Sequence, residues 1–123
     1  MDYKYSFEKL DVWQDARKFV TEIYKVSGTF PSEEKFGLCS QLQRASVSVV
    51  SNIAEGVSRQ SDKAKIRFIE ISYGSLMEVY CQLYISLDLK YLTIDQFETC
   101  KMRIDAIARQ LSALIKAYKK RID

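Results

Sequence analysis

The sequence predicts an all-α protein, an antiparallel up-down-up-down four-helix bundle, on three observations. Apolar residues recur at alternating steps of three and four along four long segments, which is the period of an amphipathic helix. Short turn segments separate these four, and short connections make neighbouring helices antiparallel. One proline and four glycines in 123 residues are few for a β-rich or loop-rich protein. We therefore expect a single domain over residues 1–123, and the three marked turns argue against the alternative, a segment of extended coiled coil.

The first predicted helix covers residues 11–27, where Val12, Phe19 and Ile23 lie on one apolar face. Asp11 is expected to cap its first turn, because a carboxylate accepts hydrogen bonds from the free amide groups there. Gly28 is expected to end this helix in the left-handed conformation, which costs glycine little.

The second predicted helix covers residues 32–58, after the helix-breaking Pro31, and carries two apolar stripes. The core stripe comprises Leu38, Leu42, Ala45, Val49 and Ile53. The other stripe, the predicted oligomer interface, comprises Val47, Val50, Ala54 and Val57. Because the core of a single bundle uses one stripe, the second predicts packing against another copy of the chain.

The third helix is predicted over residues 62–90 and the fourth over residues 94–121. Ser61 is expected to cap the third, and Thr93 and Gln96 have the spacing of a capping box at the start of the fourth. In both helices aromatic residues join the apolar stripe that faces the core, as Tyr73 and Tyr118 do.

Two glycines, Gly37 and Gly74, fall inside the predicted helices, where each costs about 1 kcal/mol relative to alanine. Such a cost is tolerated where another backbone comes close, so both positions predict tight helix contacts. Cys39 and Cys81 fall at one level of the bundle, and we expect both to be reduced thiols that serve as small apolar fillers.

A polar seam runs along the second helix between its two stripes. With the following turn centred near residues 59–60, Arg44 comes within reach of Glu78, which predicts an ion pair beside the core or at a subunit contact. Glu55 and Arg59 are four apart and are expected to pair on one helix. Asn52 is expected to satisfy backbone groups of the following loop rather than to contact a ligand. The predicted structural polar network comprises Gln41, Arg44, Asn52, Glu55 and Glu78.

Basic residues concentrate at one end of the predicted bundle. The net charge is +3, but residues 101–123 hold seven Lys and Arg against two Asp, so 7 − 2 = +5 in this segment. The topology brings the turn after the second helix beside the end of the fourth. The predicted nucleic-acid-binding residues are Arg59, Lys63, Lys65, Arg67, Lys116, Lys119, Lys120 and Arg121. A basic surface of this kind suits a polyanion or an acidic protein, and a merely solvated helix face is an equally good reading of the charge alone.

Several classes of function are disfavoured. The chain has no His and no Cys-x-x-Cys pair, so we expect no metal site and no cofactor. It shows no Gly-rich phosphate loop and no inward-facing carboxylate cluster, so we expect no enzymatic activity. Three cysteines, no secretory leader and no long apolar run predict a cytoplasmic protein that does not enter a membrane.

The motifs of the second helix resemble those of a known family. They are F-P-x-x-E-x-F-G-L-x-x-Q-L at residues 30–42, R-A-S-x-S at residues 44–48 and N-I-A-E-G at residues 52–56, followed by Arg59. Together with L-x-V-W-x-x-A at residues 10–16 and G-S-L-x-E at residues 74–78, they are similar to the four-helix-bundle proteins encoded in intervening sequences of bacterial 23S ribosomal RNA genes. Gln43 and Ser46 stand where that family often has Arg and Ala.

The resemblance implies a bundle that assembles into a ring, often a pentamer, with no established enzymatic activity. It also implies similarity to the accessory protein of diversity-generating retroelements, whose basic surface contacts a reverse transcriptase and RNA.

Two hypotheses follow: a homo-oligomeric accessory protein that binds RNA, DNA or a nucleoprotein through its basic surface, or a scaffold for a protein such as a reverse transcriptase with no direct nucleic-acid role. No groove-reading motif is evident, so sequence-specific recognition is not expected.

Overall fold

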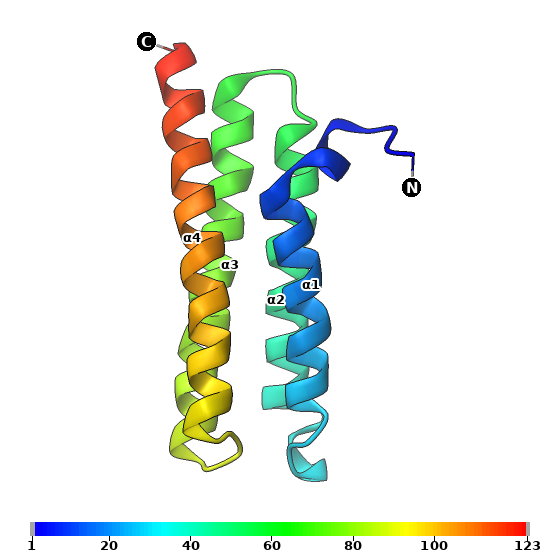
Figure 1. The fold of residues 1–123 in the computed structure, drawn as a ribbon, viewed down its shortest axis with the longest axis vertical. Coiled ribbons are helices and arrows are strands. Elements are labelled where there is room, and N and C mark those ends of the chain that lie inside the picture. Colours follow the sequence, from blue (N-terminus) through cyan, green and yellow to red (C-terminus); the bar gives the residue numbers. More distant parts are fainter. Residues whose placement is uncertain (1, 123) are drawn as a thin grey trace.

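A computed structural model of the chain describes residues 2–122, and within them the fold is an antiparallel four-helix bundle (Figure 1). The helices are α1 (Asp11–Ser27), α2 (Leu38–Val57), α3 (Asp62–Asp88) and α4 (Ile94–Ile122). Two short 3₁₀ turns, η1 (Ser6–Lys9) and η2 (Ser32–Glu34), precede α1 and α2. No strand occurs among these residues, which confirms the all-α prediction. The α2–α3 turn lies at the same end of the bundle as the C-terminus of α4, and the other two connections lie at the opposite end (Figure 1).

All four helices contribute to one apolar core. Phe19 and Ile23 of α1 are fully buried, as are Leu42 of α2, Ile69 of α3 and Ile107 of α4. These residues belong to the three-four stripes of the sequence, so the apolar spacing correctly identified the inward face of every helix.

The start of α2 differs from the prediction. The helix begins at Leu38 instead of residue 32, because the chain first forms η2 and a short turn. Glu34 Oε1 accepts the N–H of Leu38 at 3.3 Å, and this side chain caps the helix from four residues before it. Gly37, with φ −112° and ψ −111°, is the residue before the helix and not a residue inside it. A local side-chain contact thus outweighs the N-terminal signal of Ser32.

Of the two predicted terminal features of α1, the cap by Asp11 is not formed, and Gly28 ends the helix as predicted but in another conformation. Asp11 is the first residue of the helix. Leu10, at the N-cap position, makes no side-chain hydrogen bond to the first turn, because η1 leads directly into α1. Gly28 keeps a right-handed φ of −64°. The chain leaves the helix through successive short backbone bonds instead, since the N–H of Thr29 donates to the carbonyl oxygen of Val26 and that of Phe30 to Ser27.

The predicted caps of α3 and α4 are confirmed. Ser61 Oγ accepts the N–H of Ala64 at 3.1 Å. Thr93 and Gln96 form a reciprocal capping box, in which each backbone N–H donates to the other's side-chain oxygen at 2.9 and 3.1 Å. The last residues of α3 and α4 lie within two positions of the predicted ends.

Helices α2 and α3 approach each other closely through small residues. A Cβ added to Gly56 would lie 2.8 Å from Cβ of Phe68 and 3.2 Å from Cδ1 of Ile69. Farther along the pair, the Ser72 hydroxyl donates to the carbonyl oxygen of Val49 at 2.7 Å. At Gly74, which was predicted to be a tight contact, an added Cβ would meet no atom within 4 Å. The close contact of the bundle is therefore at Gly56.

The cysteines are free thiols in different surroundings. Cys39 and Cys100 are buried, but Cys81 is exposed, so its predicted role as an apolar filler is wrong. Burial raises the pKa of Cys100 to about 11, with Glu22 raising it further and Arg103 opposing the rise. Burial, and then the charge of Glu34, raise the pKa of Cys39 as well.

The two helical glycines predict opposite alanine phenotypes. Gly56→Ala is expected to lower the free energy of unfolding by about 1–3 kcal/mol, because the new methyl group overlaps Phe68. Gly74→Ala is expected to raise it by about 0.5–1 kcal/mol, because alanine stabilises a helix where space is open. Urea unfolding followed by circular dichroism measures both, and equal effects of the two substitutions would contradict the described contact at Gly56.

The thiols are expected to differ in reactivity near pH 8. Thiolates, not thiols, react with Ellman's reagent, and the raised pKa values of Cys39 and Cys100 keep these two groups protonated well above pH 8. One equivalent, from the exposed Cys81, should therefore react rapidly in the native protein, and the other two only after denaturation. Cys81→Ser should remove the rapid phase, and a rapid phase that persisted in this variant would contradict the assignment.

Candidate nucleic-acid interface

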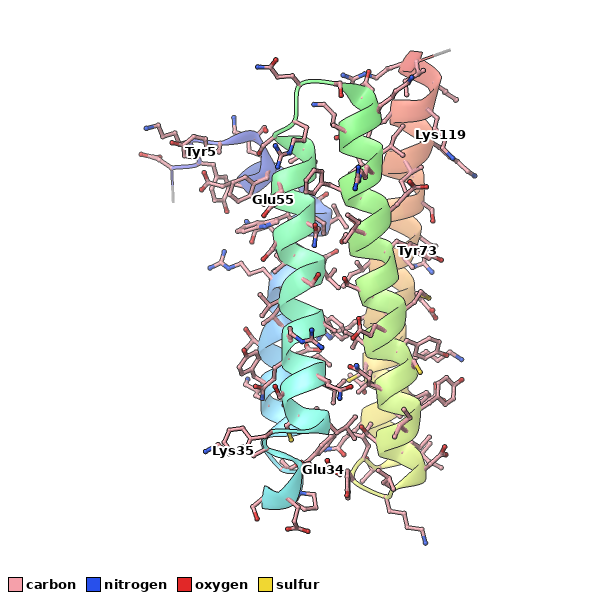
Figure 2. All side chains as sticks on the ribbon, turned by 180° about the vertical axis from the view of Figure 1, so that it is seen from behind. Tyr5, Glu34, Lys35, Glu55, Tyr73 and Lys119 are labelled. Carbon is pink, nitrogen blue, oxygen red and sulfur yellow. The ribbon has the colours of Figure 1, made fainter. Side chains whose placement is uncertain are left out.

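The predicted basic residues gather at one end of the bundle, where the α2–α3 turn lies beside the last turns of α4 (Figure 1). Figure 2 shows Glu55 and Lys119 toward this end, whereas Glu34 and Lys35 lie at the opposite end. The end is built by topology: antiparallel helices joined by short turns bring residues near 60 beside residues near 120.

Two of the eight basic residues, Lys65 and Arg121, hold the start of α3 against the end of α4. The Arg121 guanidinium lies 3.2 Å from Asp62 Oδ1. Arg121 and Lys65 also lie 5.4 and 5.6 Å from the ring centroid of the buried Tyr118. Lys65 Nζ donates to the carbonyl oxygen of Val57 at 3.4 Å. These contacts give Lys65 and Arg121 structural roles in addition to their charge.

Arg59 is also engaged within the chain. Its guanidinium lies 4.4 Å from the ring centroid of Phe68 and 3.8 Å from Glu55 Oε2, which confirms the predicted Glu55–Arg59 pair. Both side chains of the pair are about half exposed, so the pair adds at most about 0.5 kcal/mol to stability.

The other five basic side chains are exposed, and within residues 2–122 no acidic group lies within ion-pair distance of any of them. These five, called the basic end below, are Lys63, Arg67, Lys116, Lys119 and Lys120. Unpaired cations at the end of a rigid bundle attract polyanions, because their positive potential is not cancelled locally.

A groove between α3 and α4 leads away from the basic end. It consists of two hollows of about 400 and 450 Å³ that share Tyr73, Ser112 and Lys116 in their walls. The first hollow is also lined by Glu70 and Lys119. Arg109 lines the second, together with Ala108 and Ala113. We call this feature the α3–α4 groove.

The sequence predicted two residues of this groove, Lys116 and Lys119, and missed the others. Tyr73 was assigned to the core stripe, and it is half-buried against the core while one side lines both hollows. Arg109 and Ser112 precede Lys116 by seven and four residues on α4. This helical spacing of polar residues was the signal that could have identified the groove.

The predicted polar network is only partly formed. Among the ion pairs of the described residues, none joins Arg44 to Glu78, and the intrachain pair is not made. Glu78 instead accepts a hydrogen bond from Gln82 Nε2 at 3.2 Å, and the same nitrogen lies 3.4 Å from Gln41 Oε1. The Glu78 carboxylate thus bonds to Gln82 on the same helix instead of pairing with Arg44.

Asn52 contacts its own helix and not a loop. Its amide donates to the carbonyl oxygen of Ser48 at 2.8 Å and lies 3.1 Å from the Ser48 hydroxyl. That hydroxyl in turn lies 2.8 Å from the Ser75 hydroxyl of α3. The predicted bond to a loop is thus not made, and Asn52 supports the α2–α3 contact through Ser48.

The second apolar stripe of α2 is largely covered by its own chain. Val50 and Val57 are half-buried against the core. They follow Gln43 at steps of seven on one helix face, and Gln43 Nε2 donates to Ser27 of α1 at 3.0 Å, so this face meets α1. Ala54 lies beside Phe7 of η1 in a shallow hollow. Among the four stripe residues, Val47 is the one that is exposed, at 39%.

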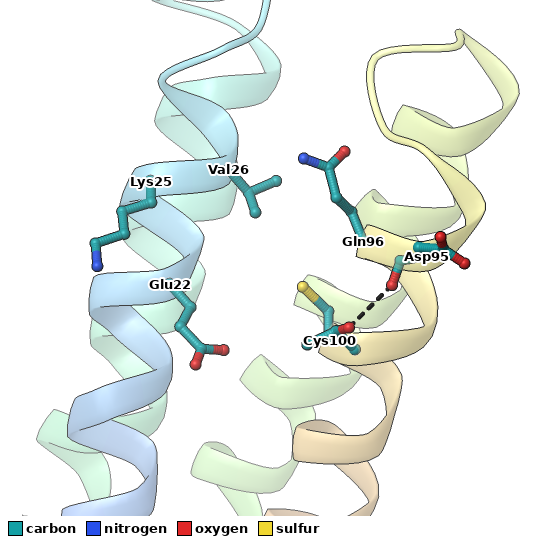
Figure 3. Close-up of a pocket in the computed structure, with 7 residues that line it drawn as sticks. Glu22, Lys25, Val26, Asp95, Gln96 and Cys100 are labelled. Atoms are coloured by element: carbon teal, nitrogen blue, oxygen red, sulfur yellow. Dashed lines mark hydrogen bonds between the residues drawn. The ribbon is translucent and has the colours of Figure 1, made fainter.

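A separate hollow of about 310 Å³ lies between α1 and α4 (Figure 3). Its wall includes Glu22, Lys25, Val26, Asp95 and Cys100, and the surface that these residues present to the hollow is mainly apolar. Glu22 already pairs with Arg103 at 2.6 Å. A mainly apolar lining offers no cluster of cations to a phosphate group, so this hollow is not a candidate for phosphate binding.

Within residues 2–122, no three His, Cys, Asp or Glu side chains gather closely enough to hold a metal ion. No helix in the same part of the chain is both long enough and apolar enough to cross a bilayer.

The fold and its basic end define a class, the small four-helix bundles with one cationic end, and sequence comparison identifies the family. The sequence model of the 23S rRNA-intervening sequence protein family matches residues 8–113. The chain therefore belongs to this family, as the motifs of α2 indicated.

A solved structure has the same fold. It is the crystal structure of a protein with unknown function from the S23 ribosomal protein family of Bacteroides thetaiotaomicron VPI-5482. The two chains are 24% identical and superpose with a TM-score of 0.79, over 85% of this chain and 98% of the other. A search of curated proteins finds no match.

Proposed function

We propose that this protein is a homo-oligomeric accessory protein that binds RNA, alone or as nucleoprotein, through its basic end. The observation that carries the proposal is the set of five exposed cations from α3 and α4 that have no acidic partner among the described residues. The resemblance to proteins encoded in ribosomal RNA genes makes RNA a better candidate than DNA.

Binding of this kind is electrostatic and depends on shape rather than sequence. Lysine and arginine that neutralise phosphates release counterions, so affinity falls as the salt concentration rises. One bundle presents few cations, and a ring-like oligomer, such as the pentamer implied by the resemblance, would repeat them on one face. Repetition converts weak single contacts into avidity.

Charge reversal at the basic end tests RNA binding. The variant Lys116→Glu/Lys119→Glu/Lys120→Glu is expected to weaken binding of a labelled RNA by more than about tenfold, because three phosphate contacts become repulsive. Arg121 is left unchanged because it holds Asp62. Fluorescence anisotropy at two salt concentrations measures the affinity, and the wild type should show a log–log salt slope of about −3 to −4 for five contacts.

The matched control reverses three exposed lysines away from the basic end, Lys18, Lys25 and Lys35, and so changes the net charge equally. This control should retain most of the wild-type affinity. Absence of RNA binding by the wild type at the lower salt concentration would refute the proposed function. Equal losses in both variants would show that net charge, and not the basic end, attracts RNA.

Self-association is supported by the outward surface of α2 and α3. Val47 on α2 is exposed, and so are Ile71 and Ile85 on α3, each at 44%. Arg44 and Glu78 are also exposed on these helices and do not pair within the chain. We propose that they pair between copies, because apolar residues beside unpaired opposite charges form a self-complementary surface.

A charge swap tests this contact. Arg44→Glu is expected to dissociate the oligomer by placing like charges together, and Arg44→Glu/Glu78→Arg is expected to restore it. Light scattering after gel filtration measures the mass of each variant. A wild type that is monomeric at micromolar concentration would remove the oligomer from the proposal, and an oligomer insensitive to Arg44→Glu would place the contact elsewhere.

The opposite end of the bundle favours a second role, protein binding. Phe36 is 89% exposed and Ile94 is 68% exposed. The segment before α2, which carries Phe36, and the α3–α4 connection, which leads into Ile94, are held together, since the Tyr91 hydroxyl donates to Glu34 Oε2 at 3.0 Å. Exposed apolar side chains on an ordered end are typical of a protein contact. A partner that stays bound to the charge-reversed variant would separate this role from RNA binding.

A further inference from the structure

We propose that the α3–α4 groove binds an unpaired nucleotide segment of the RNA strand, with a base against the Tyr73 ring and phosphates on Arg109, Lys116 and Lys119. The proposal rests on the proposed function and assigns a path and a strand type to it. A basic groove with an aromatic side chain in its wall is the usual arrangement for binding single strands without sequence preference.

The cations of the groove lie in one line along α4. Arg109, Ser112, Lys116 and Lys119 are separated by steps of three, four and three residues, which keeps them on one helix face. Ten residues of α-helix extend about 15 Å, the length of a few nucleotides. The line ends at the basic end, so a strand bound there can continue into the groove.

Tyr73 is suited to hold a base. It lies near the middle of α3, is half-buried against the core, and forms part of the wall of both hollows. Figure 2 shows Tyr73 on α3 and Lys119 on α4 on the same side of this helix pair, away from α2. Among the described residues no hydrogen bond uses the hydroxyl of Tyr73 or of Ser112, so both remain available to a ligand. Because Tyr73 is packed against the core, its ring can stack on a base at little cost in conformational entropy.

The balance of charge and the width of the groove favour a single strand. The walls of the groove contain three cations, Arg109, Lys116 and Lys119, and one carboxylate, that of Glu70. Asp105 precedes Arg109 by one helical turn on α4. Hollows of about 400 and 450 Å³ have the volume of a small-ligand site. Packed helices have axes about 8–10 Å apart, so the groove between them admits an extruded base but not a duplex.

A second aromatic site on α3, the pair Tyr80 and Tyr84, lacks the properties of the Tyr73 site. The hydroxyls of Tyr80 and Tyr84 lie 3.1 Å apart and bond each other. That bond, with smaller effects of burial and of the nearby Asp105 and Glu98 carboxylates, raises the pKa of Tyr80 to about 12. An acidic neighbourhood repels phosphate, so the nucleotide site is placed at Tyr73.

The test measures binding of a labelled single-stranded oligouridylate by fluorescence anisotropy. Tyr73→Leu is expected to weaken this binding about tenfold without changing its salt slope, because stacking is lost and no phosphate contact is. Tyr73→Phe keeps the ring and should bind within about twofold of the wild type. Tyr24→Leu, which changes a more exposed tyrosine on α1, outside the groove, should have no effect. Lys116→Gln/Lys119→Gln should reduce the salt slope by about 1.4 for two contacts.

Three competitors identify the ligand. Unlabelled single strand should displace the probe, an RNA duplex of equal length should do so less well, and uridine monophosphate should do so only at far higher concentration. A duplex that competes equally, or a mononucleotide that competes as well as the strand, would overturn the single-strand assignment.

Photocrosslinking to an oligonucleotide that contains 5-iodouridine provides a measurement on the wild type, which does not depend on the folding of any variant. An adduct on the Tyr73 peptide is expected, and adducts confined to other peptides would overturn the proposal. Unchanged affinity of a folded Tyr73→Leu variant would also overturn the proposal that the α3–α4 groove binds a nucleotide segment. The proposed function would then stand if charge reversal at the basic end still abolished binding.

Discussion

The close approach of α2 and α3 is the contact on which the rest of this structure depends. Gly56 leaves no room for a side chain beside Phe68, and the Ser72 hydroxyl reaches the backbone of α2 at Val49. Small residues and a side-chain-to-backbone bond hold the two helices in one register. That register determines where the α2–α3 turn lies. The last turns of α4 then attach to the start of α3, next to this turn, through Asp62 and Tyr118.

The same register divides the bundle into two chemically different ends. Helix connections alternate, so the start of α3, with Lys63, lies beside the end of α4, while Phe36 and Ile94 lie at the other end, before α2 and at the start of α4. One end presents cations that have no acidic partner among residues 2–122, and the other presents apolar side chains next to Glu34. The two proposed roles, RNA binding and protein binding, therefore use different surfaces and do not compete. The α3–α4 groove extends the cationic surface along the length of the bundle.

The features that could be read from the sequence are those with a local or periodic cause. Apolar spacing identified the inward faces, and the caps at Ser61 and Thr93 are formed as expected because each depends on residues three apart. Errors arose where several contacts competed for one group, because spacing alone does not say which of them forms. Glu34 caps α2 from outside the helix, and Gln82 binds Glu78 before Arg44 does. The basic end was identified because charge and topology suffice to place it, whereas Tyr73 looked like an ordinary core residue, since spacing does not say which side of a ring faces solvent.

The sequence by itself determined the number of helices, their inward faces, the family and the end at which positive charge collects, because periodicity, motifs and chain connectivity are local properties. Only the tertiary structure decided which cations are engaged within the chain, where helices come close, and how much of the second apolar stripe is left open. Val50 and Val57 meet their own core, and Val47 does not. These outcomes depend on the rotation and separation of neighbouring helices, which arise from side chains distant in sequence and packed together in space.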